Sequence, residues 1–135
     1  MIYLDTAALV KLIRREPESD ALVDWLDERG STMLVSSALA EIELARALLR
    51  TEPDLLAEVP ALLGRIARYQ IDELVRTTAA SYRTPELRSL DAIHLATAQA
   101  VFGEQLSSFV TYDRRLLACA DAIGLPTAAP GVGVS

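Results

Sequence analysis

Short apolar runs alternate with longer amphipathic segments along this chain of 135 residues. The short runs have the length and the β-branched or aromatic content of buried strands, whereas the longer segments repeat apolar residues every three or four positions, as helices do. This pattern predicts strands at residues 2–4, 32–35, 69–71, 109–112 and 127–129. It predicts helices at residues 6–15, 17–28, 38–50, 54–68, 72–82, 89–102 and 114–123.

Proline and glycine residues support several of these boundaries. Pro17 lies near the first turn of the second predicted helix, and Pro53 ends the third. Pro60 marks a break or a kink within the fourth. Gly103 and Gly124 follow the last two predicted helices, where glycine commonly ends a helix.

Strands that alternate with helices imply right-handed crossovers, and therefore a parallel sheet covered by helices on both faces. The length predicts one α/β domain over residues 1–135, with a frayed tail at residues 130–135. In such sheets, ligands bind beyond the carboxyl ends of the strands, at the point where the strand order reverses. Polar residues that directly follow the strands are therefore candidates for a functional site.

Four carboxylates occupy positions that such a sheet would bring together. Asp5 and Asp113 end the strand-like runs near the two ends of the chain, while Glu43 and Asp91 lie in predicted helices. Carboxylates about 5 Å apart repel by about 3 kcal/mol per pair at an effective dielectric constant near 20. A cluster of them therefore implies a cation, and Mg²⁺ prefers such hard oxygen ligands while retaining waters for chemistry.

Each acid taken alone also has an ordinary structural interpretation. Asp5 and Asp113 are suited to capping the helices that follow them, although Thr6 can cap the first helix as well. Asp91 follows Ser89, which can cap its helix, and an acid in a first helical turn is favoured by the helix dipole. That helix is apolar around most of its circumference, which predicts a buried carboxylate that needs a counter-charge or a metal.

The polar neighbours of these acids leave further alternatives open. Glu41 and Glu43 are two positions apart and point to different sides of one helix, and periodicity does not choose between them. His94 is the only histidine, and with a single cysteine the chain lacks the ligands of a zinc site, so a packed, hydrogen-bonded role is expected. Thr111 shares a strand face with Asp113, and its hydroxyl is suited to holding a metal-bound water.

Composition narrows the class of function. The net charge of −6 argues against unspecific nucleic-acid binding, which usually needs a basic patch. The single Cys119 excludes an internal disulfide and is typical of a reducing cytoplasm, and no apolar run approaches the roughly 20 residues that span a bilayer. Basic residues are almost all arginine, which suits bidentate phosphate contact, and the candidates are Arg46, Arg50, Arg114 and Arg115.

Four segments carry the acids, namely Tyr-Leu-Asp5-Thr6-Ala-Ala-Leu-Val, Ser37 with Glu43-Leu-Ala-Arg46-Ala-Leu after five residues, Leu-Arg-Ser-Leu-Asp91-Ala-Ile-His94-Leu-Ala, and Thr111-Tyr-Asp113-Arg-Arg-Leu. Their order and spacing resemble the PIN-domain family, and in particular the ribonuclease toxins of VapBC toxin–antitoxin pairs. The resemblance extends over nearly the whole chain. The Leu-Asp-Ala-Ile-His-Leu-Ala and Thr-Tyr-Asp segments are its most specific parts.

The resemblance implies a three-layer α/β/α sandwich with a mostly parallel central sheet. It also implies a Mg²⁺ or Mn²⁺ site and endonucleolytic cleavage of structured RNA of the tRNA or rRNA class, and it selects Glu43 over Glu41. Members of the family dimerise and are inhibited by a cognate antitoxin that lies across the acidic groove, often with an arginine against the carboxylates. An RNA substrate, an antitoxin partner, and a homodimer or larger heteromer are therefore expected, with no membrane association.

Together these observations predict a metal-dependent endoribonuclease that acts as a toxin in the cytoplasm. Asp5 and Asp91 are the expected principal metal ligands, with Asp113 as a further ligand and Glu43 completing the catalytic site, partly through water. The residues expected to support them are Thr6, Thr111 and His94. Two alternatives stay open, a non-catalytic acidic module and a PIN-like nuclease of RNA processing without an antitoxin. Metal binding distinguishes the acidic module from an enzyme.

Overall fold

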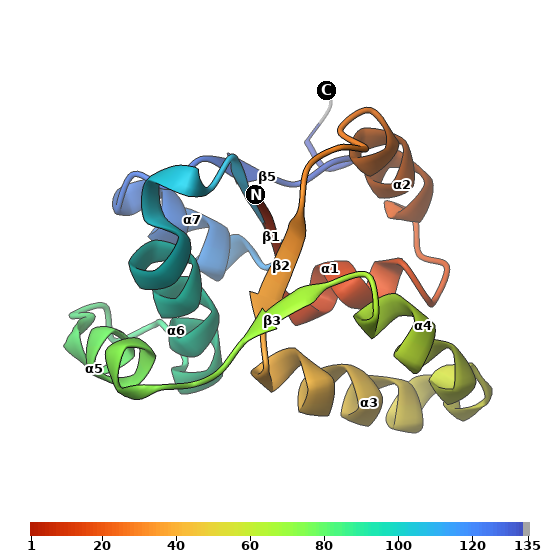
Figure 1. The fold of residues 1–135 in the computed structure, drawn as a ribbon, viewed down its shortest axis with the longest axis horizontal. Coiled ribbons are helices and arrows are strands. Elements are labelled where there is room, and N and C mark those ends of the chain that lie inside the picture. Colours follow the sequence, from red (N-terminus) through yellow and green to blue (C-terminus); the bar gives the residue numbers. More distant parts are fainter. Residues whose placement is uncertain (134–135) are drawn as a thin grey trace.

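The computed structural model describes residues 1–133, and a five-stranded sheet runs through its middle with helices on both faces (Figure 1). Its strands are β1 (Ile2–Leu4), β2 (Leu34–Ser37), β3 (Ala67–Tyr69), β4 (Ser108–Val110) and β5 (Thr127–Ala128). They lie in the order β3-β2-β1-β4-β5, and every pairing is parallel. The predicted α/β class and three-layer arrangement are confirmed, and the strand order reverses at β1.

The central strand β1 contributes side chains to two separate cores. Ile2 and Leu4 face one core, which is covered by α1 (Thr6–Lys11), α2 (Ser19–Asp27), α3 (Leu39–Thr51) and α4 (Val59–Leu63). Tyr3 faces the other core, which is covered by α6 (Ser89–Ala96) and α7 (Arg114–Ala122). All three side chains are fully buried. This alternation of side chains across one strand is what holds the three layers together.

The helical segment predicted at residues 54–68 is broken next to Pro60, in line with the expected break or kink, and it ends earlier than predicted. The chain there forms a 3₁₀ helix, η1 (Pro53–Glu58), and then the short helix α4. Pro60 lies in the first turn of α4, where its missing N–H costs no hydrogen bond, so it helps to begin a helix instead of kinking one. The next strand therefore starts earlier than predicted, at Ala67, and Arg68 belongs to β3.

Two other predicted helices are shorter than their apolar pattern suggested. The first ends at Lys11, whose ammonium group pairs with both Glu16 and Glu18 at 2.9 Å and thereby fixes the loop that leads to α2. The helix predicted over residues 89–102 is regular only to the end of α6 and continues as a π-helical segment, η2 (Thr97–Phe102). The Thr97 hydroxyl donates to the Ile93 carbonyl at 2.7 Å, a contact that perturbs helical hydrogen bonding.

The remaining elements complete the layer around α6. Helix α5 (Glu73–Ser81) packs against α6, and the 3₁₀ turn η3 (Gly103–Gln105) leads into β4. The Tyr112 hydroxyl donates to the Pro130 carbonyl at 2.9 Å, which ties the start of the predicted tail to the segment after β4. Residues 134–135 of that tail lie outside the described residues. Within residues 1–133, no helix combines the length and the apolar character that a membrane span requires.

We predict that Leu44→Ala destabilises the fold far more than Leu49→Ala. Both side chains lie on α3, but Leu44 is fully buried in the core against β1, whereas Leu49 is 51% exposed. Truncating a buried leucine leaves a cavity and typically costs about 3 kcal/mol, whereas an exposed one costs less than about 0.5 kcal/mol. Urea unfolding of the two variants measures the difference. Equal losses would show that α3 does not pack as described.

Candidate active site

Asp5 and Asp113 follow the two strands between which the sheet order reverses. Asp5 caps α1, because its Oδ1 accepts from the Ala8 amide at 3.0 Å. Asp113 caps α7, with its Oδ1 accepting from the amides of Arg115 at 2.8 Å and Leu116 at 3.0 Å. The capping interpretation therefore holds for both acids, and it uses only one oxygen of each. The alternative cap at Thr6 is wrong, since Thr6 is the first residue of α1.

Asp5 is held as well by Thr111, which lies directly after β4 and not within a strand as expected. Its Oδ2 accepts from the Thr111 hydroxyl at 2.5 Å, and the same hydroxyl accepts from the Asp113 amide at 3.1 Å. Thr111 thus joins the two strand-following acids, and its hydroxyl is directed to Asp5 instead of to a water. Asp5 is only 4% exposed. Burial raises the pKa of Asp5 above its usual value, although the hydrogen bonds from Thr111 and Ala8 oppose this shift.

Asp91 is the least satisfied of the four acids. It lies in the first turn of α6, whose N-cap residue is Arg88 and not Ser89 as expected. Its carboxylate forms no hydrogen bond or ion pair with any other residue in the described part of the chain. Burial and the negative charge of Asp113 raise the pKa of Asp91, with a further contribution from Glu43. The helix itself is less buried than its composition suggested.

Glu43, and not Glu41, faces this edge of the sheet. Its Oε1 accepts from the Thr6 hydroxyl at 2.6 Å and from His94 Nε2 at 2.7 Å. Burial alone would raise the pKa of Glu43, but these two hydrogen bonds outweigh it and hold the pKa below its usual value. Glu41 points away and pairs with Arg68 at 3.2 Å. The structure therefore distinguishes two glutamates that helical periodicity could not.

His94 is a packed, hydrogen-bonded neighbour of the acids. It is 2% exposed, and its Nδ1 lies 2.7 Å from the Tyr3 hydroxyl on the opposite side of the ring from Glu43. A role for Tyr3 was not predicted from the sequence. The only signal was a hydroxyl-bearing aromatic in a central strand, and nothing in the sequence pairs that strand with α6.

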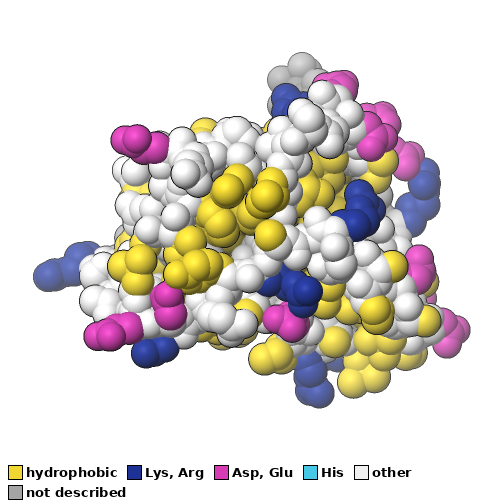
Figure 2. All heavy atoms as spheres, viewed as in Figure 1, with side chains coloured by type: hydrophobic (Ala, Val, Ile, Leu, Met, Phe, Trp, Pro, Cys, Tyr) yellow, Lys and Arg dark blue, Asp and Glu magenta, His cyan; other side chains and the backbone are white. Residues whose placement is uncertain are grey.

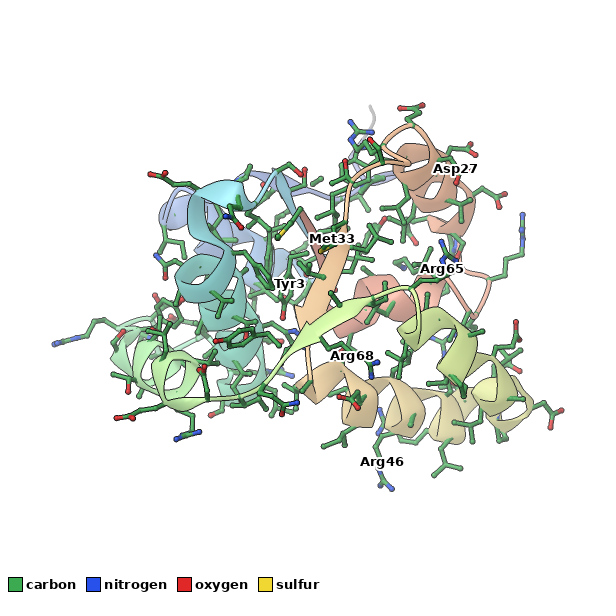
Figure 3. All side chains as sticks on the ribbon, in the orientation of Figure 1. Tyr3, Asp27, Met33, Arg46, Arg65 and Arg68 are labelled. Atoms are coloured by element: carbon green, nitrogen blue, oxygen red, sulfur yellow. The ribbon has the colours of Figure 1, made fainter. Side chains whose placement is uncertain are left out.

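The candidate phosphate-binding arginines fall into two groups. Arg46 and Arg50 line a pocket of about 460 Å³ beside Glu43 and Thr6, and Figure 3 shows Arg46 extending outward from α3. A second pocket, of about 260 Å³, is lined by two acids and three arginines, namely Asp91, Asp113, Arg88, Arg114 and Arg115. Arg88 was missed, although its position one turn before Asp91 at a helix start was the signal that could have found it.

The four acids gather at one edge of the sheet without forming a closed set of metal ligands. Over residues 1–133, no three acidic, histidine or cysteine side chains converge closely enough to hold an ion as they stand. The donor set nevertheless fits a hard cation, because it consists of oxygens and includes Asp91, whose pKa stays raised although His94 and Arg88 oppose the shift. Water would complete the coordination of such an ion, as is usual for Mg²⁺.

Similarity to known proteins extends over nearly the whole chain. A family model described as "PIN domain" matches residues 2–122. The chain is 54% identical over 132 residues to Ribonuclease VapC35 of Mycobacterium tuberculosis, covering 97% of this chain and 98% of that protein. It is 43% identical over 129 residues to Ribonuclease VapC46 of the same organism, covering 96% and 97% respectively.

Two solved structures share the fold. One is VapBC2 from Rickettsia felis bound to a DNA fragment from its promoter, with a TM-score of 0.72 and 17% identity over 96% of this chain and 99% of that chain. The other is FitAcB from Neisseria gonorrhoeae, with a TM-score of 0.63 and 27% identity over 96% and 98%. The first similarity, at this identity, concerns the fold alone.

We predict that Asp91→Asn stabilises the metal-free protein at neutral pH. A raised pKa means that the folded state binds the proton more tightly than the unfolded chain does. Stability therefore falls as the pH rises from the unfolded pKa of about 4 through the higher folded pKa, so the ionised carboxylate is the destabilising form. Removing the charge should raise Tm by about 3 °C in EDTA, with the gain disappearing below about pH 4.

The matched control is Asp24→Asn, which removes an exposed acid from α2, a helix that carries none of the four site acids. Thermal unfolding followed by circular dichroism, at equal protein concentration, compares both variants with the wild type. A lower Tm for Asp91→Asn at pH 7 would show that this carboxylate stabilises α6 and is not under electrostatic strain.

Proposed function

Because the chain belongs to the PIN-domain family, we propose that it is a divalent-metal-dependent endoribonuclease and the toxin of a toxin–antitoxin pair. Relatives that align over nearly its whole length are named ribonucleases. The observation that carries the proposal is the edge formed by Asp5, Asp91, Asp113 and Glu43. Asp91 has no partner of its own there, and the charges of Asp113 and Glu43 act upon it.

We assign the metal site to Asp5, Asp91 and Asp113, with Mg²⁺ as the proposed ion and Mn²⁺ as a substitute. PIN-domain ribonucleases generally use a divalent metal, and three carboxylates suit a hard ion of this kind. When bound, the cation supplies a Lewis acid that offsets charge on the phosphate and makes water a better nucleophile. Thr111 fixes the orientation of Asp5, so that the Asp5 carboxylate is positioned before any ion arrives.

Glu43 is the proposed proton acceptor. Its Oε1 is occupied by two donors, which leaves Oε2 for a water molecule, and its lowered pKa keeps the carboxylate ionised. In the proposed reaction a water oxygen attacks the phosphorus in line with the leaving oxygen, and the P–O bond to that oxygen breaks. The water proton passes to Glu43, and the leaving oxygen takes a proton from a solvent water. We propose that the arginines that line the second pocket, Arg88, Arg114 and Arg115, bind the scissile phosphate.

A structured RNA of the tRNA or rRNA class, located in the cytoplasm, is the proposed substrate. The net charge is −6, and Lys and Arg side chains are scattered singly over the face drawn in Figure 2. A surface of this kind cannot hold RNA by unspecific attraction. Recognition of a folded RNA through a few phosphate contacts and a metal ion is consistent with this charge distribution.

The proposed partner is a cognate antitoxin that acts on this acidic edge of a homodimer or larger assembly. One solved structure of this fold is of VapBC2 bound to DNA, which motivates the partner class. An arginine is the best occupant of such an edge, since its planar guanidinium group binds a carboxylate through two hydrogen bonds. Such an arginine would compete with both the metal and the substrate phosphate.

We predict that cleavage requires Glu43 and a divalent ion but not Glu41. Glu43→Gln should lower kcat at least 100-fold, because it removes the proton acceptor. Glu41→Gln changes the same residue type two positions away on α3 and should retain full activity, because Glu41 pairs only with Arg68. Cleavage of a tRNA with Mg²⁺ or Mn²⁺, with an EDTA control, measures all three effects.

Unchanged cleavage in EDTA would exclude the metal mechanism. Loss of activity in Glu41→Gln but not in Glu43→Gln would show that the proton acceptor is Glu41 and that its assignment to Glu43 is wrong. No cleavage of any RNA, together with tight binding of a basic peptide that ignores Mg²⁺, would favour the non-catalytic acidic module.

We predict that the antitoxin arginine contributes most of the inhibition. Truncating one partner of a desolvated arginine–carboxylate pair typically costs about 2–5 kcal/mol. Replacing that arginine by alanine in the cognate antitoxin should therefore weaken inhibition of RNA cleavage by more than tenfold. Full inhibition by an antitoxin without any basic residue in its groove-binding segment would be incompatible with this mode.

A further inference from the structure

His94 is held by side chains at both of its ring nitrogens. Nδ1 lies 2.7 Å from the Tyr3 hydroxyl, and Nε2 lies 2.7 Å from Glu43 Oε1 and 3.2 Å from the Thr6 hydroxyl. Because a carboxylate only accepts hydrogen bonds, Nε2 carries the proton that is donated to Glu43. In the neutral ring, Nδ1 then accepts from the Tyr3 hydroxyl.

Tyr3 is a rigid support for this ring. It lies on β1 with no exposed surface, and its own ring stacks on Phe109 of β4 with centroids 5.2 Å apart. It meets His94 edge to face, with centroids 5.8 Å apart. Figure 3 shows Tyr3 beside the sheet, on the side of α6. The orientation of His94 is therefore fixed from the centre of the fold.

The fixed His94 ring in turn restricts the position of the Glu43 side chain. Thr6 and His94 both donate to Oε1, so the carboxylate has two donors on one oxygen and its Oε2 stays available to the acidic edge. Fixing a glutamate side chain in one rotamer costs conformational entropy. The two hydrogen bonds to Oε1 offset this cost and keep the side chain from turning out into solvent. The contacts thus run in one line from Tyr3 through His94 to Glu43.

We propose that Tyr3 and His94 are positioning residues for the cleavage reaction, and that they hold Glu43 with Oε2 directed to the attacking water. The inference rests on the proposed function, and it concerns residues that touch neither the RNA nor the metal. A misplacement of about 1 Å at a reacting group can cost about 100-fold in rate. Loss of this support should therefore lower kcat and leave KM for RNA unchanged.

The kinetic test uses variants that keep the packing. His94→Leu removes both hydrogen bonds and should lower kcat about 100-fold, whereas His94→Gln restores a donor to Glu43 and should recover at least tenfold of that loss. Tyr3→Phe keeps the stacked ring and removes only the hydroxyl, and it should lower kcat about fivefold. The control is Tyr82→Phe, which removes a hydroxyl that donates to Gln99 at 2.7 Å and should leave kcat unchanged.

A second readout does not depend on activity. His94 is the only histidine, so ¹⁵N-labelled histidine gives one pair of ring nitrogen signals. In metal-free protein the nitrogen spectrum should show a single tautomer with the proton on Nε2, and Tyr3→Phe, but not Tyr82→Phe, should shift the Nδ1 signal. A proton on Nδ1, or a mixture of tautomers, would overturn the proposed arrangement.

The two proposals fail in different ways. If the wild type cleaves RNA but His94→Leu and Tyr3→Phe retain its kcat, the positioning role is wrong and the ribonuclease function stands. An equal fall in apparent kcat for every variant, including Tyr82→Phe, would likewise assign these residues to folding alone, because a smaller folded fraction lowers kcat and not KM. If the wild type cleaves no RNA while the nitrogen spectrum shows the expected tautomer, the contacts are correct and the proposed function fails.

Discussion

The reversal of strand order at β1 is the constraint on which the rest of the site depends. β1 pairs with β2 on one side and with β4 on the other, so the segments that follow β1 and β4 meet at the carboxyl edge of the sheet. Both cores fix β1, since its three residues are fully buried. As a result, Thr111 and Asp5 are hydrogen-bonded at 2.5 Å although 106 residues separate them.

The four carboxylates at this edge of the sheet differ in how many hydrogen bonds they accept. Asp5 and Asp113 each accept amide hydrogen bonds at the start of a helix, and Glu43 accepts from Thr6 and His94. These contacts stabilise the carboxylates without a cation. Asp91 has no comparable contact, so burial and the charges of its neighbours raise its pKa. The pKa of the buried Asp5 is raised as well, so two of the four acids, Asp5 and Asp91, are those whose charge a cation would stabilise.

The sequence predicted those features that depend on local patterns, and missed those that depend on tertiary contacts. Short apolar runs located the strands and the sheet class, but Pro60 is compatible with either a kinked helix or a new helix start, so the helix boundaries around α4 were wrong. Asp5 could not be assigned either to a cap or to a site, because a residue that follows a strand and precedes a helix is compatible with both. The Tyr3–His94 contact spans 91 residues, and no periodicity along the chain encodes it.

The central claim is that Asp5, Asp91 and Asp113 bind a divalent ion at the carboxyl edge of the sheet. A crystal structure of the protein with Mn²⁺, with diffraction data collected at a wavelength where manganese scatters anomalously, tests it most directly. The account predicts an anomalous peak between these three carboxylates, and its absence from crystals of Asp91→Asn. A peak elsewhere on the surface, or none at this edge when the crystals contain excess Mn²⁺, would contradict it.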